Sequence, residues 1–121
     1  MSKNNFKEFK VWQKSRALVK DVYILLRAFP DDEKFGLISQ MKRAAISIPS
    51  NIAEGTGRGT NKDFNRFLYI SLGSSYELET QFILSQDLEF IKDEKAHEII
   101  NNISEVQRMI HGLIQSLDKS L

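Results

Sequence analysis

Three cationic residues recur at intervals of four directly after a glycine-rich segment. Arg58, Lys62 and Arg66 fall on one side of a helix, because an α-helix completes a turn about every 3.6 residues. The segment 55–59 reads GTGRG, leaves backbone amides accessible and is followed by a predicted helix N-terminus. Amides and a helix N-terminus together can hold a phosphate group, so this pattern predicts an anion site.

Two more basic residues, Lys42 and Arg43, lie earlier in the chain and complete the candidate nucleic-acid-binding set. The expected chemistry is contact with a nucleic-acid backbone, whose phosphates are neutralised by Lys and Arg. Binding of a free nucleotide is rejected, because the glycine run lacks the lysine–serine pair of a phosphate-binding loop and no strand precedes it. A plain turn between two helices explains the same glycines.

The residues with acid–base or metal-binding side chains do not form a catalytic pattern. His97 and His111 are about 21 Å apart along one helix, so they cannot share a metal ion within one chain. The di-iron bundle motif requires a histidine three positions after a glutamate, and neither Glu77 nor Glu79 is followed by one. The chain contains no cysteine. We therefore predict that the protein is not an enzyme and has no catalytic residue, metal site or cofactor.

These residues must be positioned by helices. Apolar residues at intervals of three and four predict helices over about 9–28, 32–55, 61–88 and 93–118. Short connections make sequential helices antiparallel neighbours, so the expected fold is all-α, an up-down-up-down four-helix bundle. Pro49 lies inside the second helix, where the apolar spacing continues across it, so we expect that helix to be kinked.

Helix ends and core stripes follow from the same spacing. Pro30 ends the first helix, the second starts near Asp32, and Thr60 with Asp63 resembles a capping box for the third. The residues expected to face the core are Val11, Ser15, Leu18, Val22, Leu25, Phe29, Leu37, Met41, Ala44, Ile48, Ile52, Gly55, Phe64, Phe67, Leu68, Ser71, Ser75, Leu78, Phe82, Ile99, Ile103, Val106, Ile110, Leu113 and Leu117, with Ile100 and Ile114 at the flank.

A polar stripe runs beside the apolar stripe of the second helix. Gln40, Ser47, Asn51 and Glu54 fall within a narrow arc, and Ser74 occupies a comparable flank of the third helix. Polar groups next to a core are usually half-buried and hydrogen-bonded to one another, and such a layer can fix helix register. The functional alternative is a shared binding site, so we expect either a structural layer or an exposed patch.

The third helix has a second apolar face formed by Tyr69, Leu72, Tyr76 and Ile83. A monomer would leave this face in water, so burial between subunits is the physical alternative. The other interpretation is that the tyrosines tolerate exposure and Leu72 lies at the edge of the core. We predict that the protein is a homo-oligomer and that this face is its interface.

Composition limits the class of protein. The length of 121 residues fits a single domain, 1–121, which can bury a core without disulfides or metals. No segment approaches the ~20 apolar residues of a membrane span, and the N-terminus lacks the apolar core of a signal peptide. We expect a cytoplasmic protein without membrane contacts.

The net charge of +1 hides an asymmetry between the halves of the chain. Residues 1–66 contain 13 Lys and Arg against 7 Asp and Glu, whereas residues 67–121 contain 4 against 9. The division indicates a charge match between molecules, a basic patch for a polyanion, or a chance clustering of surface charges.

The middle of the chain resembles a known family. Residues 35–55 read FGLISQMKRAAISIPSNIAEG and are similar to the signature of the four-helix-bundle proteins encoded in 23S ribosomal RNA intervening sequences. The same pattern includes VWQK at 11–14, the Phe-Pro pair at 29–30, Gly-Arg at 57–58, and Gly-Ser with Glu-Leu-Glu at 73–79. The resemblance extends over nearly the whole chain.

This resemblance implies an up-down bundle that assembles as a homopentamer and has no established enzymatic activity. A role in RNA or DNA binding is suspected for the family, which is also similar to the accessory protein of diversity-generating retroelements. The function we predict is binding of an RNA or DNA backbone through basic patches that an oligomer repeats. The alternative is a protein–protein interaction scaffold without a nucleic-acid role, whose partner the sequence does not identify.

Overall fold

The amphipathic segments form four α-helices in the computed structural model of the protein, which describes residues 5–119. The helices are α1 (Lys10–Leu26), α2 (Leu37–Thr56), α3 (Asn61–Asp87) and α4 (Asp93–Lys119). Two short 3₁₀ turns, η1 (Phe6–Glu8) and η2 (Asp31–Glu33), precede α1 and α2. The part of the chain that the structure describes contains no strand, so the predicted all-α class is confirmed.

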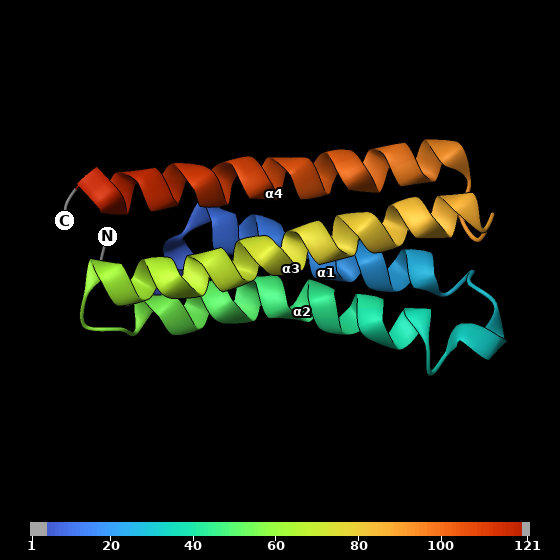
Figure 1. The fold of residues 1–121 in the computed structure, drawn as a ribbon, viewed down its shortest axis with the longest axis horizontal. Coiled ribbons are helices and arrows are strands. Elements are labelled where there is room, and N and C mark those ends of the chain that lie inside the picture. The colour runs from blue at the N-terminus through green and yellow to red at the C-terminus, as the bar shows by residue number, and fades with distance from the viewer. Residues whose placement is uncertain (1–4, 120–121) are drawn as a thin grey trace.

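Helices that follow one another in the chain lie side by side. α1 packs on α2 and α4, and α3 also packs on α2 and α4, so each helix has two neighbours. Figure 1 shows the chain running along α1, back along α2, forward along α3 and back along α4. The α2–α3 turn therefore lies at one end of the molecule, and the α1–α2 and α3–α4 connections lie at the other.

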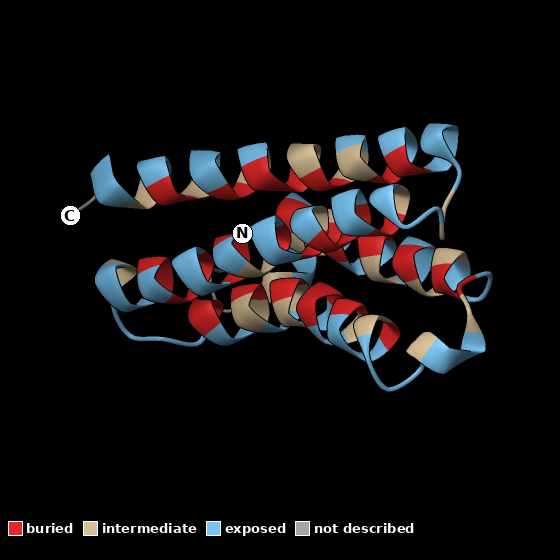
Figure 2. Ribbon diagram, turned by 45° about the vertical axis from the view of Figure 1, so that its right-hand side comes forward, coloured by how far each residue is buried: buried red, intermediate tan, exposed pale blue. Residues whose placement is uncertain are grey.

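The core lies along the axis of the bundle, where the helices turn their apolar stripes toward one another. Figure 2 shows the buried residues on the inner faces of the helices and the exposed ones on the outer faces. Met41, Ile48 and Phe82 are among the largest side chains that are fully buried. The predicted stripes of α1, α2 and α3 are confirmed, except that Leu25 and Leu37 are only half-buried.

The apolar stripe of α4 shifts around the helix toward its C-terminus. Ile103 and Ile110 are buried as predicted, but Leu113 and Leu117 are half-buried, and Ile114, which we placed at the flank, is only 3% exposed. A strict seven-residue repeat drifts by about 20° per heptad around a straight α-helix. The drift explains why the core position passes to Ile114.

The second helix begins later than the predicted range 32–55. Residues 31–33 form a separate 3₁₀ turn, in which the Glu33 amide donates to the Pro30 carbonyl at 3.0 Å. Gly36 has φ −109° and ψ −110°, which is not helical, and it separates this turn from α2. The prediction from the sequence joins the 3₁₀ turn to α2, because the acidic residues of the turn resemble those of a first helical turn.

The other helix ends are close to the predictions. Thr60 Oγ1 accepts a hydrogen bond from the Asp63 amide at 3.1 Å, so the predicted cap of α3 is confirmed. α1 ends at Leu26, and the next three amides donate to carbonyls three positions back instead of continuing the helix. α2 continues through Pro49 without interruption, and the kink expected there stays a prediction.

The outer face of α3 is apolar, but it does not include every residue that the sequence places there. Tyr69, Tyr76 and Ile83 are 56%, 47% and 44% exposed. The assignment of Leu72 to this face is wrong, because Leu72 is only 5% exposed and belongs to the core of the single chain. It lies one turn after Leu68 on the buried side of the helix.

Candidate nucleic-acid interface

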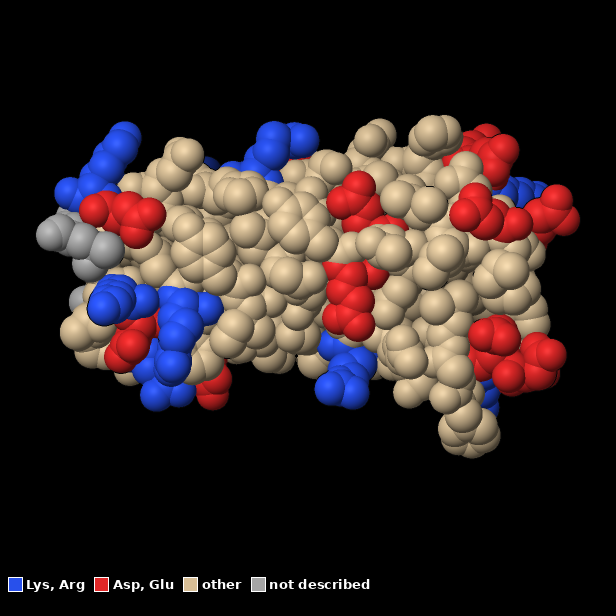
Figure 3. Space-filling model, in the orientation of Figure 1, with Lys and Arg blue, Asp and Glu red and all other residues tan. Residues whose placement is uncertain are grey.

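Charged side chains of both signs occur at each end of the bundle, but in different proportions. Figure 3 shows Lys and Arg gathered at the end that holds the α2–α3 turn, and Asp and Glu prominent at the opposite end. Arg58, Lys62 and Arg66 lie near the turn. The carboxylates near the other two connections belong to Asp31, Asp32, Glu33, Asp87, Glu89, Asp93 and Glu94. This difference between the two ends is distinct from the asymmetry between the halves of the sequence, because Asp31, Asp32 and Glu33 belong to the basic half.

A close approach of α2 to α3 shapes the basic end. A Cβ atom on Gly55 would lie 2.9 Å from Phe64 Cδ1 and 3.0 Å from Phe67 Cβ. A larger residue would push the helices apart at this point. Glycine therefore allows the short connection that places Arg58 next to the first turns of α3.

Two arginines hold their guanidinium groups against one aromatic ring. Arg58 Cζ lies 4.5 Å from the centroid of the Phe67 ring, and Arg66 Cζ lies 5.4 Å from it. Arg58 is also 3.9 Å from the Glu54 carboxylate, but an exposed pair at this distance contributes little. Among the described residues, Lys62 and Arg66 form no ion pair. Arg58, Lys62 and Arg66 are called the basic cluster below.

The glycine run contributes less to an anion site than the sequence predicts. The Gly57 amide donates to the Glu54 carbonyl at 3.2 Å, and the Arg58 amide donates to the Gly55 carbonyl at 3.1 Å. These two amides close the C-terminus of α2 and are not free for a ligand. The prediction that the glycines leave accessible amides is therefore wrong for Gly57, and the cationic side chains remain.

Lys42 and Arg43 do not join the basic cluster. They lie about 20 Å along α2 from Thr56, where the helix ends before Arg58, and side chains of adjacent helical residues point about 100° apart. Lys42 Nζ lies 4.8 Å from the centroid of the Tyr23 ring on α1. Arg43 instead lines a pocket between α2 and α3 that also contains Glu77. The structure thus separates two of the five predicted nucleic-acid-binding residues from the other three.

The middle of the polar stripe forms a hydrogen-bonded layer between α2 and α3. The Ser47 and Ser74 hydroxyl oxygens are 2.8 Å apart, and Asn51 Nδ2 donates to the hydroxyl and the carbonyl of Ser47, each at 2.9 Å. Nearby, the buried Ser71 hydroxyl donates to the Ile48 carbonyl at 2.8 Å. These contacts hold the two helices in one register, as the structural interpretation expects.

The two ends of the polar stripe are exposed and do not belong to this layer. Glu54 faces solvent beside Arg58. Gln40 lies at the opposite end and is also exposed. The pocket beside it measures about 410 Å³ and is lined by Gln40, Arg43, Ala44, Ser47, Ser74 and Glu77.

A pocket next to the basic cluster is lined in part by residues outside the predicted sites, Asn65 and Asp118. It measures about 390 Å³ and is lined by Lys62, Asp63, Asn65, Arg66, Tyr69 and Asp118. Asn65 Nδ2 donates to Asp118 Oδ1 at 2.6 Å. The sequence offers one signal, because Asn65 is a polar residue directly beside the core residue Phe64. Asp118 comes from α4, and only the fold brings it to this place.

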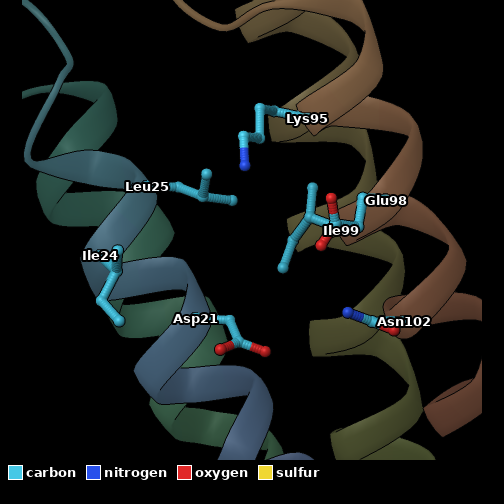
Figure 4. A pocket seen from close by; sticks show the side chains of 7 residues that line it. All are labelled: Asp21, Ile24, Leu25, Lys95, Glu98, Ile99 and Asn102. Carbon is cyan, nitrogen blue, oxygen red and sulfur yellow. The ribbon is translucent and has the colours of Figure 1, made fainter.

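A second groove, of about 180 Å³, lies between α1 and α4 nearer the acidic end. Figure 4 shows Asp21 on one wall and Glu98 with Asn102 on the other, while Leu25 and Ile99 point toward one another. Asp21 and Glu98 outnumber Lys95 among the residues that line this groove, so the groove repels phosphate. In the pocket beside the basic cluster, by contrast, Lys62 and Arg66 balance the two carboxylates. This groove is therefore not part of the candidate nucleic-acid interface.

The histidines lie apart from these sites. Within the described residues, no group of three or more His, Cys, Asp or Glu side chains is placed to hold a metal ion. His111 Nε2 lies 3.1 Å from the Tyr76 hydroxyl on the exposed surface, and His97 is also exposed. The lack of enzymatic activity stays a prediction.

None of the described helices combines the length and the apolar character needed to cross a bilayer.

Known proteins share both the sequence pattern and the fold. The family model described as 23S rRNA-intervening sequence protein matches residues 7–112. A solved structure from Bacteroides thetaiotaomicron VPI-5482, described as a protein with unknown function from the S23 ribosomal protein family, is 26% identical with a TM-score of 0.81. The match covers 93% of this chain and 98% of that chain. No curated protein matches the sequence at a significant level. Because the family model spans nearly all of the bundle, the chain belongs to the 23S rRNA-intervening sequence protein family.

Proposed function

We propose that the protein is a non-enzymatic, self-associating bundle that binds the backbone of RNA or DNA through the basic cluster. One observation carries this proposal: Arg58, Lys62 and Arg66 are exposed together at one end of the bundle, remote from the acidic end. Each phosphate that such a cation neutralises releases counterions, and this release supplies most of the affinity for a nucleic-acid backbone.

The contact of two arginines with Phe67 supports the choice of a phosphate ligand. A guanidinium group can stack on an aromatic ring and still present N–H groups at its edge to phosphate oxygens. A side chain that is already held on a ring loses less conformational freedom when it binds. Arg58 and Arg66 are therefore favourably prepared for backbone contacts.

We also propose that copies of the chain associate through the outer face of α3, and the family resemblance sets a pentamer as the expected assembly. Tyr76, Ile83 and Leu84 are 47%, 44% and 47% exposed on this face. A row of large apolar side chains favours burial against a partner. A ring would repeat the basic cluster once per copy, so weak contacts at single sites would add to a tight interaction.

The same apolar face favours a second candidate function, a scaffold that binds another protein. The two functions differ in their response to salt. Phosphate contacts weaken steeply with added salt, whereas an apolar protein interface does not. A protein partner would therefore stay bound under conditions that release a nucleic acid.

The test measures fluorescence anisotropy of labelled RNA and DNA at about 50 mM and about 200 mM salt. We expect binding at the lower concentration and a steep loss at the higher. The variant Arg58→Gln/Lys62→Gln/Arg66→Gln removes the basic cluster and should abolish binding. The matched control, Lys34→Gln/Lys92→Gln/Lys95→Gln, removes three exposed cations near the acidic end and should bind like the original protein.

Two results would overturn the proposal. The first is no binding to either nucleic acid at the lower salt concentration. The second is an equal loss of affinity in both triple variants, because binding would then depend on total charge and not on the cluster. Either result leaves the protein scaffold as the remaining function.

A further inference from the structure

We infer that the pocket beside the basic cluster holds an unpaired nucleobase, so that the protein prefers single-stranded to double-stranded nucleic acid. This inference rests on the proposed function and adds the base to the backbone contacts. The pocket of about 390 Å³ lies between α3 and the C-terminal part of α4. Its volume is near the lower end of small-ligand sites, about 300–1,000 Å³, which suits one base better than a larger group.

Tyr69 supplies the stacking surface of this pocket, whereas the association face proposed above consists of Tyr76, Ile83 and Leu84, which lie about two or more turns farther along α3 and do not line the pocket. It lines the pocket and is 56% exposed, although a large aromatic residue gains most from burial. Bases of single-stranded nucleic acids stack on exposed aromatic side chains, and every base can do so because each has a π-face. A base lying on Tyr69 would cover part of this exposed ring.

The basic cluster and the pocket share two residues. Lys62 and Arg66 line the pocket, and Arg66 is also held against Phe67 with Arg58. A backbone phosphate bound by these cations therefore lies at the border of the pocket. The base of the same nucleotide is then close enough to enter it.

The two carboxylates that line the pocket, Asp63 and Asp118, distinguish a base from a second phosphate. Asp118 would repel a phosphate, whereas a carboxylate oxygen accepts hydrogen bonds from the N–H groups on a base edge. Asn65 Nδ2 holds Asp118 Oδ1 at 2.6 Å and leaves the second carboxylate oxygen to accept from a ligand.

Within the part of the chain that the structure describes, the side-chain oxygen of Asn65 lacks a hydrogen-bond donor. It is only 5% exposed, and among the described residues its buried Oδ1 has no hydrogen-bond partner. Buried polar atoms are nearly always hydrogen-bonded, so an unpartnered oxygen in a pocket-lining residue calls for an explanation. An N–H donor brought by a base would satisfy it after a small movement of the side chain.

These contacts require an unpaired base. In a duplex, the Watson–Crick edges of the bases are paired and both faces are stacked on neighbours, so no base is free to enter the pocket. The backbone of a duplex can still reach the basic cluster. The pocket should therefore strengthen the binding of single strands without preventing the binding of duplexes.

The test compares three labelled probes: a single-stranded oligonucleotide, its duplex, and a single strand of the same length with abasic sites. Tyr69→Leu keeps apolar bulk but removes the ring, and Tyr69→Phe keeps the ring. We expect Tyr69→Leu to weaken binding of the intact single strand by roughly 5- to 150-fold and to leave the other two probes unchanged. Tyr69→Phe should bind like the original protein.

Phe35→Leu is the matched control, because Phe35 is an aromatic residue that is 91% exposed, lies between η2 and α2 away from the outer face of α3, and does not line the pocket. It should bind all three probes like the original protein, and light scattering on the same samples should show the same assembly for both Tyr69 variants. Equal affinity for intact and abasic strands, or equal losses in Tyr69→Leu and Phe35→Leu, would overturn the inference and leave backbone binding standing. No binding to any probe would overturn both.

Discussion

Gly55 and Phe64 lie so close together that a Cβ atom on Gly55 would be 2.9 Å from Phe64 Cδ1. The Phe64 ring can move away by rotating its side chain, but Phe67 Cβ, at 3.0 Å, is attached directly to the backbone and cannot turn away. We therefore predict that Gly55→Ala lowers the free energy of unfolding by about 1–3 kcal/mol, measured by urea denaturation. Gly59→Ala is the control, because a Cβ atom there meets nothing within 4 Å. Equal stability of the two variants would contradict this packing argument.

Substitution of two other glycines, both within helices, should raise the free energy of unfolding instead of lowering it. A Cβ atom on Gly73 or Gly112 meets nothing within 4 Å, and both residues are exposed within helices. Alanine at either position should raise the free energy of unfolding of the single chain by about 0.5–1 kcal/mol, because alanine is the better helix former. Thermal denaturation followed by circular dichroism measures this change. If Gly73→Ala alone reduces the mass of the assembly, a partner approaches the α3 backbone closely at that point.

Alanine substitutions at Asn51 and Glu54 should have different effects on stability, although the two residues are only one helical turn apart. Asn51→Ala removes two hydrogen bonds to Ser47 in the layer between α2 and α3, and it should cost about 1–2 kcal/mol of stability. Glu54→Ala removes an exposed carboxylate 3.9 Å from Arg58 and should change stability by less than about 0.5 kcal/mol. Denaturation curves of the two variants give both values. A large loss in Glu54→Ala would show that Glu54 is buried against another subunit.

Substitutions at Leu72 and Ile83 test core packing and association of subunits separately. Leu72→Ala should lower the free energy of unfolding by about 2–5 kcal/mol, because Leu72 is only 5% exposed within one chain. Ile83→Ser changes a side chain that is 44% exposed and should leave the fold intact while reducing the mass measured by light scattering. An unchanged mass for Ile83→Ser together with Tyr76→Ser would place the interface elsewhere.

The basic cluster predicts a measurable salt dependence. Each phosphate contact that is lost should reduce the slope of log affinity against log salt by about 1 unit. Arg58→Gln and Arg66→Gln should each produce such a reduction, whereas Lys42→Gln should not, because Lys42 lies against Tyr23 on α1. A smaller slope for Lys42→Gln would mean that the nucleic acid extends along the bundle.

The core could be predicted because helical periodicity depends only on local spacing. Met41, Ile48 and Phe82 follow this spacing and are fully buried. The assignment of Leu72 fails for a tertiary reason: α3 packs on both α2 and α4, so its buried arc is wider than one stripe. The start of α2 is missed because the break at Gly36 depends on backbone angles that the residue types alone do not reveal.

The candidate site also contains residues that the sequence predicts and residues that it does not. The spacing of Arg58, Lys62 and Arg66 identifies a cluster because all three lie near one turn. Asp118 could not be assigned, because it is 53 residues from Asn65 in the sequence and meets it only across the α3–α4 contact.

The separation of charge between the two ends has a consequence for how the molecule approaches a polyanion. A strand of phosphates attracts the end with the α2–α3 turn and repels the end with the other two connections, so the electric field exerts a torque on the bundle before contact. The long axis would then meet the strand end-on, and the sides of the bundle would stay free for neighbouring copies to stand next to one another along it.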